Sequence, residues 1–303
     1  MTKPKLTQEL IAAIRGEIFR KPEWEAVADE MRGLCDGKRR TMHRISRFYF
    51  YDERTKARGM NGRPFYNVVE NDEDFRRVYD LAWRYLSCDF DEKKPVESMA
   101  AMMAGFGRLF RAYHIPSMFP FKRAREIMER YNTNGKVFDY SCGWGNRLCA
   151  ALSLGLDYYG VDTNPDLVAI LNRFAEDFNT ATGQATPHEI RCWGSEKFIP
   201  EYQGKFGLCF SSPPYFDMEL YRGDQSCTRH DDYQTWLDCY LKPTIENCVA
   251  YLANGGYFVC NIKNSAYLKL RMYDDAFRIC EGCGLQFVCD EPLKVAKRSG
   301  CRD

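Results

Sequence analysis

A serine, two prolines and an aromatic residue follow an apolar run in the second half of this 303-residue chain. Residues 206–210, Phe-Gly-Leu-Cys-Phe, have the length and apolarity of a buried strand. Pro213 and Pro214 cannot extend a strand, because neither has a backbone N–H and each restricts the residue before it. We therefore expect the Ser212 hydroxyl, a rigid carbonyl and the Tyr215 ring at the carboxyl end of this strand, where open α/β sheets bind ligands. Such groups suit chemistry on an amino group attached to a planar ring.

A glycine-containing turn follows an earlier expected strand, residues 136–140. Gly143 and Gly145 stand one residue apart where this strand would turn into a helix, so a ligand can approach the backbone and a helix amino end. Asp162 follows the next expected strand, where a carboxylate can accept hydrogen bonds from a ribose diol. The third glycine of a dinucleotide fingerprint is missing, which argues against a pyrophosphate ligand. A nucleoside without pyrophosphate points to S-adenosylmethionine.

The elements that must position these residues alternate between strands and helices from about residue 121 onward. The expected strands are residues 136–140, 158–161, 189–193, 206–210, 256–262 and 285–289. The expected helices are residues 122–131, 146–155, 165–179, 232–253 and 267–282. This alternation predicts an α/β fold with a doubly wound, mostly parallel, Rossmann-like sheet.

The first third of the chain has a different pattern. Helical spacing of apolar residues predicts two helices within residues 6–34 and further helices at 72–87 and 97–112. Residues 37–64 are basic, aromatic and punctuated by glycine, which favours a pair of strands or loops. The sequence therefore predicts two domains: a mainly helical N-terminal accessory region, residues 1–112, and an α/β domain, residues 113–303.

Three segments resemble, in one consistent order, the amino methyltransferases that act on exocyclic amines of nucleic-acid bases. The segment that begins at Asp139, Asp-Tyr-Ser-Cys-Gly-Trp-Gly-Asn-Arg, resembles their D-P-F-C-G-S-G cofactor motif. Residues 212–215, Ser-Pro-Pro-Tyr, resemble their S-P-P-Y catalytic motif. Residues 119–127, just upstream, look like the segment that closes over the methionine end of the cofactor. The resemblance covers roughly residues 115–290.

This resemblance implies a methyltransferase fold, S-adenosylmethionine as cofactor, and methyl transfer to a base amine, with DNA as the expected substrate. N4 of cytosine is favoured by the serine at the first motif position, and N6 of adenine is close behind. The implied catalytic residues are Ser212, Pro213, Pro214 and Tyr215. The implied cofactor contacts are Phe119, Lys122, Asp139, Ser141, Cys142, Gly143, Gly145, Asp162 and Ser195.

The residue types fit that chemistry. The amino nitrogen of cytosine or adenine is a poor nucleophile because its lone pair is delocalised into the ring. If the Ser212 hydroxyl and the Pro213 carbonyl hold its two hydrogens, the nitrogen can pyramidalise, and positioning supplies the catalysis. Tyr215 would stack on a base that has left its duplex, and Phe216 would extend the same wall.

The chain departs from the family pattern at two places. Trp144 replaces a small residue between the glycines, so it either covers the cofactor or fills the turn. After the third strand the family commonly places an acidic residue on the adenine amino group, whereas this chain has Gly194-Ser195-Glu196. Few residues follow residue 289, so target recognition is expected from residues 1–112. Asn261 and Lys263 are expected to line the pocket from the adjacent strand end.

A basic segment in the accessory region is the expected DNA contact. Residues 38–63 hold nine basic side chains and only two acidic ones, which attracts phosphate. Arg39, Arg40 and Arg44 are the expected contacts, and the aromatic residues 48–51 could stack on bases. The competing interpretation is a solvated face with those aromatic residues in the core.

Composition bears on where the protein is located and on what its cysteines do. No apolar run approaches the length of a membrane span, and the polar N-terminus has no signal-peptide core, so a cytoplasmic protein without a membrane partner is expected. Cysteines within apolar patterns indicate buried free thiols, and Cys280 and Cys283 are better explained as structural than as zinc ligands. Two alternatives stay open: methylation of an RNA base amine, and a non-catalytic nucleic-acid-binding module on a methyltransferase fold.

Overall fold

The computed structural model describes residues 2–59, 63–109, 115–216, 219–220, 226–265 and 269–293. The chain divides into two compact units, Met1–Ile262 and Lys263–Asp303. The domain boundary predicted near residue 112 falls within residues 110–114, outside the described residues. It stays a prediction.

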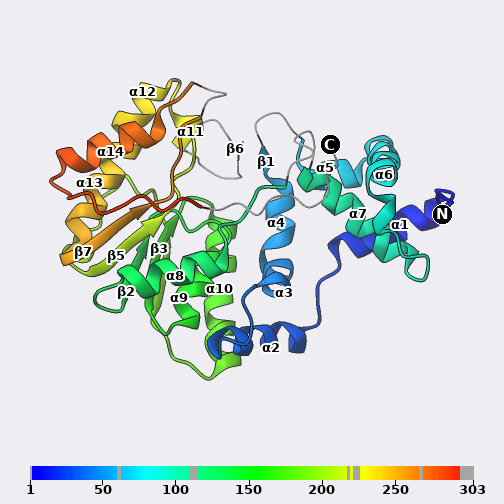
Figure 1. Ribbon diagram of the computed structural model, residues 1–303, viewed down its shortest axis with the longest axis horizontal. Coiled ribbons are helices and arrows are strands. Elements are labelled where there is room, and N and C mark those ends of the chain that lie inside the picture. Colours follow the sequence, from blue (N-terminus) through cyan, green and yellow to red (C-terminus); the bar gives the residue numbers. More distant parts are fainter. Residues whose placement is uncertain are drawn as a thin grey trace. The chain divides into compact units, whose positions relative to one another are not determined.

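A five-stranded parallel sheet forms the centre of the first unit. Its strands are β2 (Lys136–Asp139), β3 (Asp157–Asp162), β4 (His188–Cys192), β5 (Phe206–Ser211) and β7 (Leu252–Cys260), in the order β4-β3-β2-β5-β7. The order reverses between β2 and β5, so the chain winds outward in both directions from this point (Figure 1). The predicted α/β, doubly wound, Rossmann-like sheet is confirmed.

Helices cover both faces of the sheet, and side chains that alternate along each strand explain why. Val137, Leu208 and Phe210 belong to a large cluster shared with α8 (Phe121–Tyr131), α9 (Asn146–Ser153) and α10 (Pro165–Thr182). Phe138 and Cys209 point to a second cluster with α13 (Lys242–Tyr251). Since both faces of β5 are covered, all six of its residues are buried, as a parallel sheet requires.

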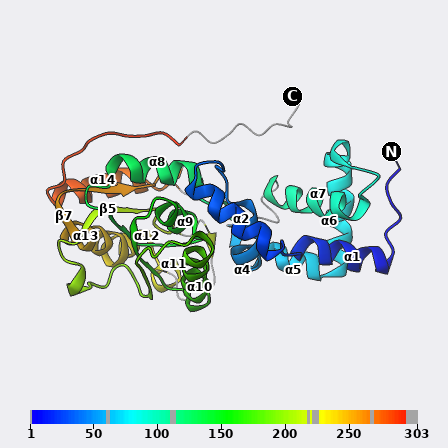
Figure 2. The same cartoon turned by 90° about the horizontal axis from the view of Figure 1, so that it is seen from below.

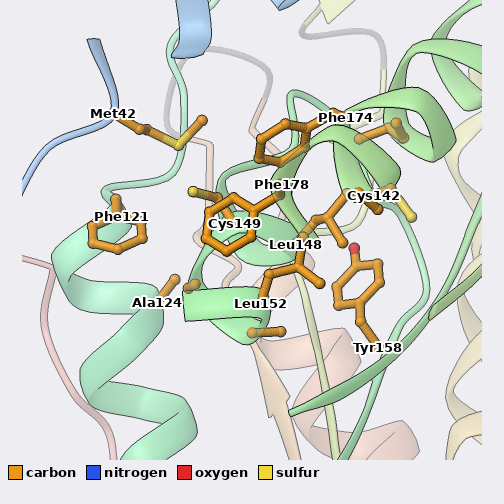
Figure 3. Close-up of a cluster of buried hydrophobic side chains, with 14 of the residues drawn as sticks. Met42, Phe121, Ala124, Cys142, Leu148, Cys149, Leu152, Tyr158, Phe174 and Phe178 are labelled. Atoms are coloured by element: carbon orange, nitrogen blue, oxygen red, sulfur yellow. The ribbon is translucent and has the colours of Figure 1, made fainter. Parts of the chain in front are cut away.

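The accessory region is helical, and it is divided between two hydrophobic clusters. Its elements are α1 (Gln8–Phe19), α2 (Trp24–Cys35), α3 (His43–Ile45), the π-helix η1 (Ser46–Phe50), α4 (Tyr51–Lys56), α5 (Phe65–Glu70), α6 (Asp72–Leu86), the short η2 (Ser87–Asp89) and α7 (Pro95–Leu109). Helices α1, α5, α6 and α7 lie together around a core of their own (Figure 2). By contrast, α2, α3 and η1 pack into the core of the sheet, where Met42 lies among side chains of α8, α9 and α10 (Figure 3).

The prediction of strands or loops over residues 37–64 was wrong for the middle of that segment, residues 43–56. Residues 43–56 are continuously helical, through α3, η1 and α4. The physical reason is that Ile45, Tyr49 and Phe50 are buried at helical spacing against the core of the sheet. Among the described residues of this segment, only Arg58–Gly59 form a strand, β1, whose backbone pairs antiparallel with β6 (Glu219–Leu220), a few residues after the S-P-P-Y motif.

The remaining elements flank or follow the sheet. In the first unit these are η4 (Pro200–Tyr202), α11 (Ser226–Arg229), α12 (Tyr233–Trp236) and the π-helix η5 (Leu237–Leu241). The second unit contains α14 (Met272–Gly282). The strand predicted at residues 285–289 was wrong, because this segment has no ladder partner among the described residues, and Phe287 and Val288 are exposed. Within the described ranges, no helix has both the length and the apolarity needed to cross a membrane.

Candidate active site

The two sequence motifs meet where the strand order of the sheet reverses. The glycine turn, residues 140–145, follows β2, and the S-P-P-Y motif, residues 212–215, follows β5. Because β2 and β5 are neighbouring parallel strands, their carboxyl ends lie at the same edge of the sheet. Open α/β sheets bind ligands at this edge, where the strand order reverses.

Asp139 joins the two motifs through hydrogen bonds. Its side chain is fully buried, and its Oδ1 accepts a hydrogen bond of 2.7 Å from Ser211 Oγ, one residue before the S-P-P-Y motif. The same hydroxyl lies 3.1 Å from the carbonyl oxygen of Ser141 in the glycine turn. Oδ1 also accepts from the Ser141 backbone N–H at 3.2 Å, and Oδ2 accepts from Tyr158 Oη at 2.8 Å. Asp139 therefore fixes the turn and the end of β5 relative to each other.

Arg147, in the first turn of α9, neutralises Asp139. Its Nε donates to Asp139 Oδ2 at 2.7 Å and its Nη2 donates to Oδ1 at 3.2 Å, in the paired geometry that guanidinium and carboxylate favour. Nη2 also donates to the carbonyl oxygens of Ser141 and Cys142. Burial disfavours the charge of Arg147, but the attraction of the Asp139 carboxylate outweighs it and raises the pKa of the guanidinium. The ion pair is thus an internal brace for the turn.

The glycine turn uses backbone conformations that suit glycine. Gly143 and Gly145 have φ values of +56° and +71°, in the left-handed region. At Gly145 there is a second restriction, because a Cβ atom would lie 2.5 Å from the ring of Phe50 in η1. Trp144, between them, is half-buried and packs against the core of the sheet. The Cys142 side chain is buried in that core, and burial raises its thiol pKa, so the turn can present only the Cys142 backbone to a ligand.

Asp162 closes the other side of the turn from the end of β3. Its Oδ2 accepts from the Gly143 N–H at 3.0 Å, and its Oδ1 accepts from the Asn164 N–H at 3.1 Å. Burial raises the pKa of this carboxyl, although the two backbone donors oppose the shift. Each oxygen still has a lone pair, so the carboxylate can accept two further hydrogen bonds from a diol.

The end of β4 carries a buried oxygen with no partner. Ser195 is turned into the protein, where its Oγ lies 2.9 Å from Thr244 Oγ1 of α13. Its neighbour Glu196 accepts from Arg229 Nη1 at 2.7 Å through Oε1. The other carboxylate oxygen, Glu196 Oε2, is buried and has no hydrogen-bond partner within the described part of the chain. At this strand end Glu196, rather than Ser195, has an acceptor available for a ligand.

The side chains of the S-P-P-Y motif are held by Asn261, the residue directly after β7. Asn261 Nδ2 donates to Ser212 Oγ at 2.8 Å, and Tyr215 Oη donates to the Asn261 carbonyl oxygen at 3.1 Å. Ser212 and Tyr215 are half-buried, whereas Pro213 is buried between them. The motif therefore presents a hydroxyl and a phenol ring at partly open positions of the strand end.

Phe216 packs against two aromatic side chains of α12. Its ring centroid lies 5.7 Å from that of Tyr233 and 5.8 Å from that of Trp236, and Trp236 is fully buried. The Trp236 indole N–H donates to Ser226 Oγ at 3.1 Å. These contacts fix the direction in which the chain leaves the S-P-P-Y motif.

Phe119, in the segment before α8, reaches the site, whereas Lys122, in α8 itself, does not. The Phe119 carbonyl accepts from Asn146 Nδ2 at 2.7 Å, and its ring meets the ring of Phe210 edge to face at 5.3 Å. Lys122 is exposed on α8 and forms an ion pair of 3.6 Å with Glu126 in the same helix. No contact in the described ranges joins Lys122 to the glycine turn.

The three predicted DNA-contacting arginines lie in and after the turn that joins α2 to α3. Arg39, Arg40 and Arg44 are exposed, and none has a carboxylate within ion-pair distance among the residues that the structure places. Glu30 lies beneath them, only 3 % exposed, and its Oε2 accepts from the Ile45 N–H at 2.8 Å. The aromatic residues nearby do not share this exposure, because Tyr49 and Phe50 are buried in the core of the sheet.

Sequence reasoning missed Arg147 and Ser211, which connect the two motifs. The one charged residue of α9 was an available signal, since a buried arginine requires an acidic partner. The serine before Ser212 gave no comparable signal, because its role depends on which strands are neighbours. In the described ranges, no three His, Cys, Asp or Glu side chains come together as a metal site would require.

Comparisons with known proteins returned structures but no sequence relatives. No family model matches the chain, and no curated protein matches it. A geranyl diphosphate methyltransferase in complex with SAM has a TM-score of 0.38 and 13 % identity, over 54 % of this chain and 64 % of the other. A SAM-dependent methyltransferase from Agrobacterium tumefaciens has a TM-score of 0.37 and 18 % identity, over 57 % of this chain and 54 % of the other.

A third solved structure covers more of the chain. Geranyl diphosphate C-methyltransferase from Streptomyces coelicolor A3(2), in complex with Mg²⁺, geranyl diphosphate and S-adenosyl-L-homocysteine, has a TM-score of 0.36 and 12 % identity, over 92 % of this chain and 80 % of the other. This chain spans less than two thirds of the length of the first three structures found, at 64 %, 56 % and 65 %. Likeness at this level determines neither cofactor nor substrate.

Proposed function

We propose that this protein transfers a methyl group from S-adenosylmethionine to an exocyclic amine of a DNA base, with N4 of cytosine favoured and N6 of adenine next. The observation that carries the proposal is the bridge made by Ser211 Oγ to Asp139 and to the Ser141 carbonyl, at 2.7 and 3.1 Å. Through it the glycine turn and the S-P-P-Y motif form one site at the switch point of the sheet.

The residues present fit this cofactor. The left-handed glycines let a ligand approach the backbone of the turn, and Asp162 keeps lone pairs for a ribose diol. Glu196 Oε2, which is buried and has no partner among the described residues, is an acceptor of the kind that an adenine amino group requires. Asp139 does not suit direct contact with the cofactor, because Arg147 already neutralises its charge and its carboxylate oxygens already accept hydrogen bonds from protein donors. We assign Asp139 to holding the turn rather than to direct contact.

The chemistry at the target amine follows from the groups that the S-P-P-Y motif presents. When bound, S-adenosylmethionine supplies an electrophilic methyl group. Ser212 Oγ and the Pro213 carbonyl accept the two amine hydrogens, so the nitrogen can pyramidalise and its lone pair becomes available. Tyr215 stacks on the extruded base and keeps the amino nitrogen in line with the methyl group that it attacks. The proton that the nitrogen finally sheds passes to water, so the site requires no strong base.

DNA contact is assigned to the turn between α2 and α3. Arg39, Arg40 and Arg44 are exposed cations without carboxylate partners among the described residues, so they remain available to phosphate oxygens. The accessory region also reaches the loop after the catalytic motif, since β1 pairs with β6. Both features support a role for residues 1–112 in target binding.

The direct test is transfer of labelled methyl groups. The protein is incubated with methyl-tritiated S-adenosylmethionine and with duplex DNA, single-stranded DNA or RNA, and the labelled nucleoside is identified after digestion. We expect N4-methylcytidine in its deoxy form. A labelled ribonucleoside would overturn DNA as the substrate. If a calorimetric titration shows no affinity for S-adenosylmethionine, the proposal that the protein is a methyltransferase is overturned.

Variants of the motif test where the chemistry takes place. Ser212→Ala and Tyr215→Ala should each lower turnover by about 100-fold or more, while cofactor affinity stays close to that of the unaltered protein. An equal loss of turnover and cofactor affinity would mean that methyl transfer does not take place at the S-P-P-Y motif.

A further inference from the structure

Asn261 makes more contacts with the catalytic motif than any assigned role explains. Its backbone N–H donates to the Ser211 carbonyl at 2.9 Å, which continues the ladder between β5 and β7 by one residue. Its side-chain Nδ2 lies 2.8 Å from Ser212 Oγ and 3.5 Å from Tyr215 Oη, and its carbonyl oxygen accepts from Tyr215 Oη at 3.1 Å. One residue therefore contacts both side chains of the motif that would meet a substrate.

These contacts determine what Ser212 can offer a ligand. A serine hydroxyl has one proton and two lone pairs. The Asn261 N–H occupies one lone pair, so one lone pair and the proton remain, and the hydroxyl can no longer rotate freely. Because the backbone of Asn261 is fixed by the strand ladder, the proton and the remaining lone pair of Ser212 are confined to the two other positions around its oxygen.

We propose that Asn261 is the positioning residue of this site, which orients the Ser212 hydroxyl and the Tyr215 ring to receive the target amine. The inference rests on the proposed function for its catalytic meaning, but the contacts exist without it. Asn261 acts through Ser212 and Tyr215 and does not itself touch the reacting atoms.

The first test separates turnover from binding. Asn261→Ala should lower kcat by about 10- to 100-fold, because Ser212 loses its donor and rotates, while the Kd for cofactor stays unchanged. The matched control is Asn172→Ala, which removes a half-buried amide that donates to the Val168 and Ile190 carbonyls at 3.0 and 3.1 Å, away from the motif. The control should leave kcat unchanged.

A second variant is tested by the pH dependence of its activity, which would not change if Asn261 had a merely structural role. In Asn261→Asp the ionised carboxylate cannot donate to Ser212 Oγ, whereas the protonated carboxyl can. The activity of Asn261→Asp relative to the unaltered protein should therefore rise as the pH falls. A ratio that does not change with pH would overturn the donor role.

A third measurement needs no turnover. With 3-fluorotyrosine placed at position 215, fluorine NMR follows the titration of that phenol in the free protein. A carboxylate at position 261 lies close to the phenol oxygen, so Asn261→Asp should raise the phenol pKa, whereas Asn172→Asp should leave it unchanged.

The outcomes distinguish this inference from the proposed function. If Ser212→Ala loses turnover and Asn261→Ala keeps it, the positioning role is overturned and methyl transfer stands. If no base amine is methylated at all, the proposed function fails, and the phenol titration decides the contact: a shift in Asn261→Asp supports the orienting role of Asn261, and no shift overturns it.

Discussion

The hydroxyl of Ser211 donates to the Asp139 carboxylate at 2.7 Å, and this bond joins neighbouring strands whose loops carry the two halves of the site. Both side chains are fully buried. A bond of this kind transmits any displacement of the glycine turn directly to the residue that precedes Ser212. The glycine turn and the S-P-P-Y motif are therefore expected to change together when this hydrogen bond is broken.

Ser211→Ala tests this relationship. The change leaves a buried carboxylate oxygen with one donor fewer, so the free energy of unfolding should fall by about 1–3 kcal/mol. Cofactor affinity should weaken as well, since the Ser141 carbonyl loses the same hydroxyl. Urea denaturation and calorimetric titration measure the two effects. Ser153→Ala is the control, because Ser153 is also buried but its Oγ donates to the Ala150 carbonyl in its own helix; a similar loss of cofactor affinity there would contradict the argument.

The buried ion pair between Arg147 and Asp139 gives the second prediction. Arg147→Met leaves an uncompensated buried carboxylate and should lower the free energy of unfolding by about 3–5 kcal/mol. The double variant Asp139→Asn/Arg147→Met removes both charges and should recover part of that loss. Thermal and urea unfolding of Arg147→Met, of Asp139→Asn and of the double variant, compared with the unaltered protein, form a double-mutant cycle.

An exposed ion pair is the matched control for that cycle. Arg278 pairs with Asp275 at 2.7 Å, and its side chain is 66 % exposed. Arg278→Met should change the free energy of unfolding by less than about 1 kcal/mol, because solvent screens the pair. If Arg147→Met lowers the free energy of unfolding by no more than Arg278→Met does, the ion pair with Arg147 does not stabilise Asp139.

The sequence predicted the sheet well because its signals were local. Apolar runs followed by helical spacing identified β2, β3, β4 and β5, and the proline pair located the end of β5. Parallel alternation then placed both motifs at one edge of the sheet before any contact was known.

Predictions failed where a residue's partner was distant in sequence. The aromatic residues 48–51 favour strands by propensity, yet Tyr49 and Phe50 become helical because they pack against Phe174 of α10. The contact of Phe50 with Gly145 could not be predicted either, because the two residues are far apart in the sequence. Residues 285–289 have the composition of a strand, but composition does not supply the neighbouring strand that a ladder requires.

The contact of Phe50 with Gly145 gives the third prediction. Gly145→Ala adds a Cβ atom that meets the buried Phe50 ring, and it also places alanine at a φ of +71°. Gly155→Ala is the control, since Gly155 has a φ of +67° and open space around its Cβ position. The control should cost about 1–3 kcal/mol from backbone strain alone. Gly145→Ala should cost more and should weaken cofactor binding, and equal losses in the two variants would contradict a steric role for Phe50.

Burial of Asp162 gives a prediction about pH. Its folded-state pKa is raised above the ordinary 3.8, so as pH rises the unfolded chain loses this proton first. The stability contributed by Asp162 is therefore greatest at low pH and is lost as pH rises through the folded-state pKa. In Asp162→Asn this contribution is absent. Relative to Asp162→Asn, the unaltered protein should lose stability in urea titrations as the pH rises above the ordinary carboxyl pKa of 3.8. A stability difference that does not change with pH would contradict the raised pKa.

The fifth prediction concerns the salt dependence of DNA binding. Each phosphate neutralised by a side chain releases counterions, which contributes about 0.9 to the slope of log K against log salt for duplex DNA. Arg39→Gln, Arg40→Gln and Arg44→Gln should each lower the slope by about 1 if the side chain contacts a phosphate. Fluorescence anisotropy with a labelled duplex at several salt concentrations measures the slope.

Arg173→Gln is the control for this series. Arg173 is 70 % exposed and pairs with Asp177 at 3.5 Å, so its charge is already compensated and its loss should leave the slope nearly unchanged. If all four variants behave alike, the effect is one of net charge, and the turn between α2 and α3 is a solvated face. If only the three turn variants lower the slope, the accessory region binds the DNA backbone through the residues that lie above Glu30, and weakening should be similar for every DNA sequence, because phosphate contacts carry no base information.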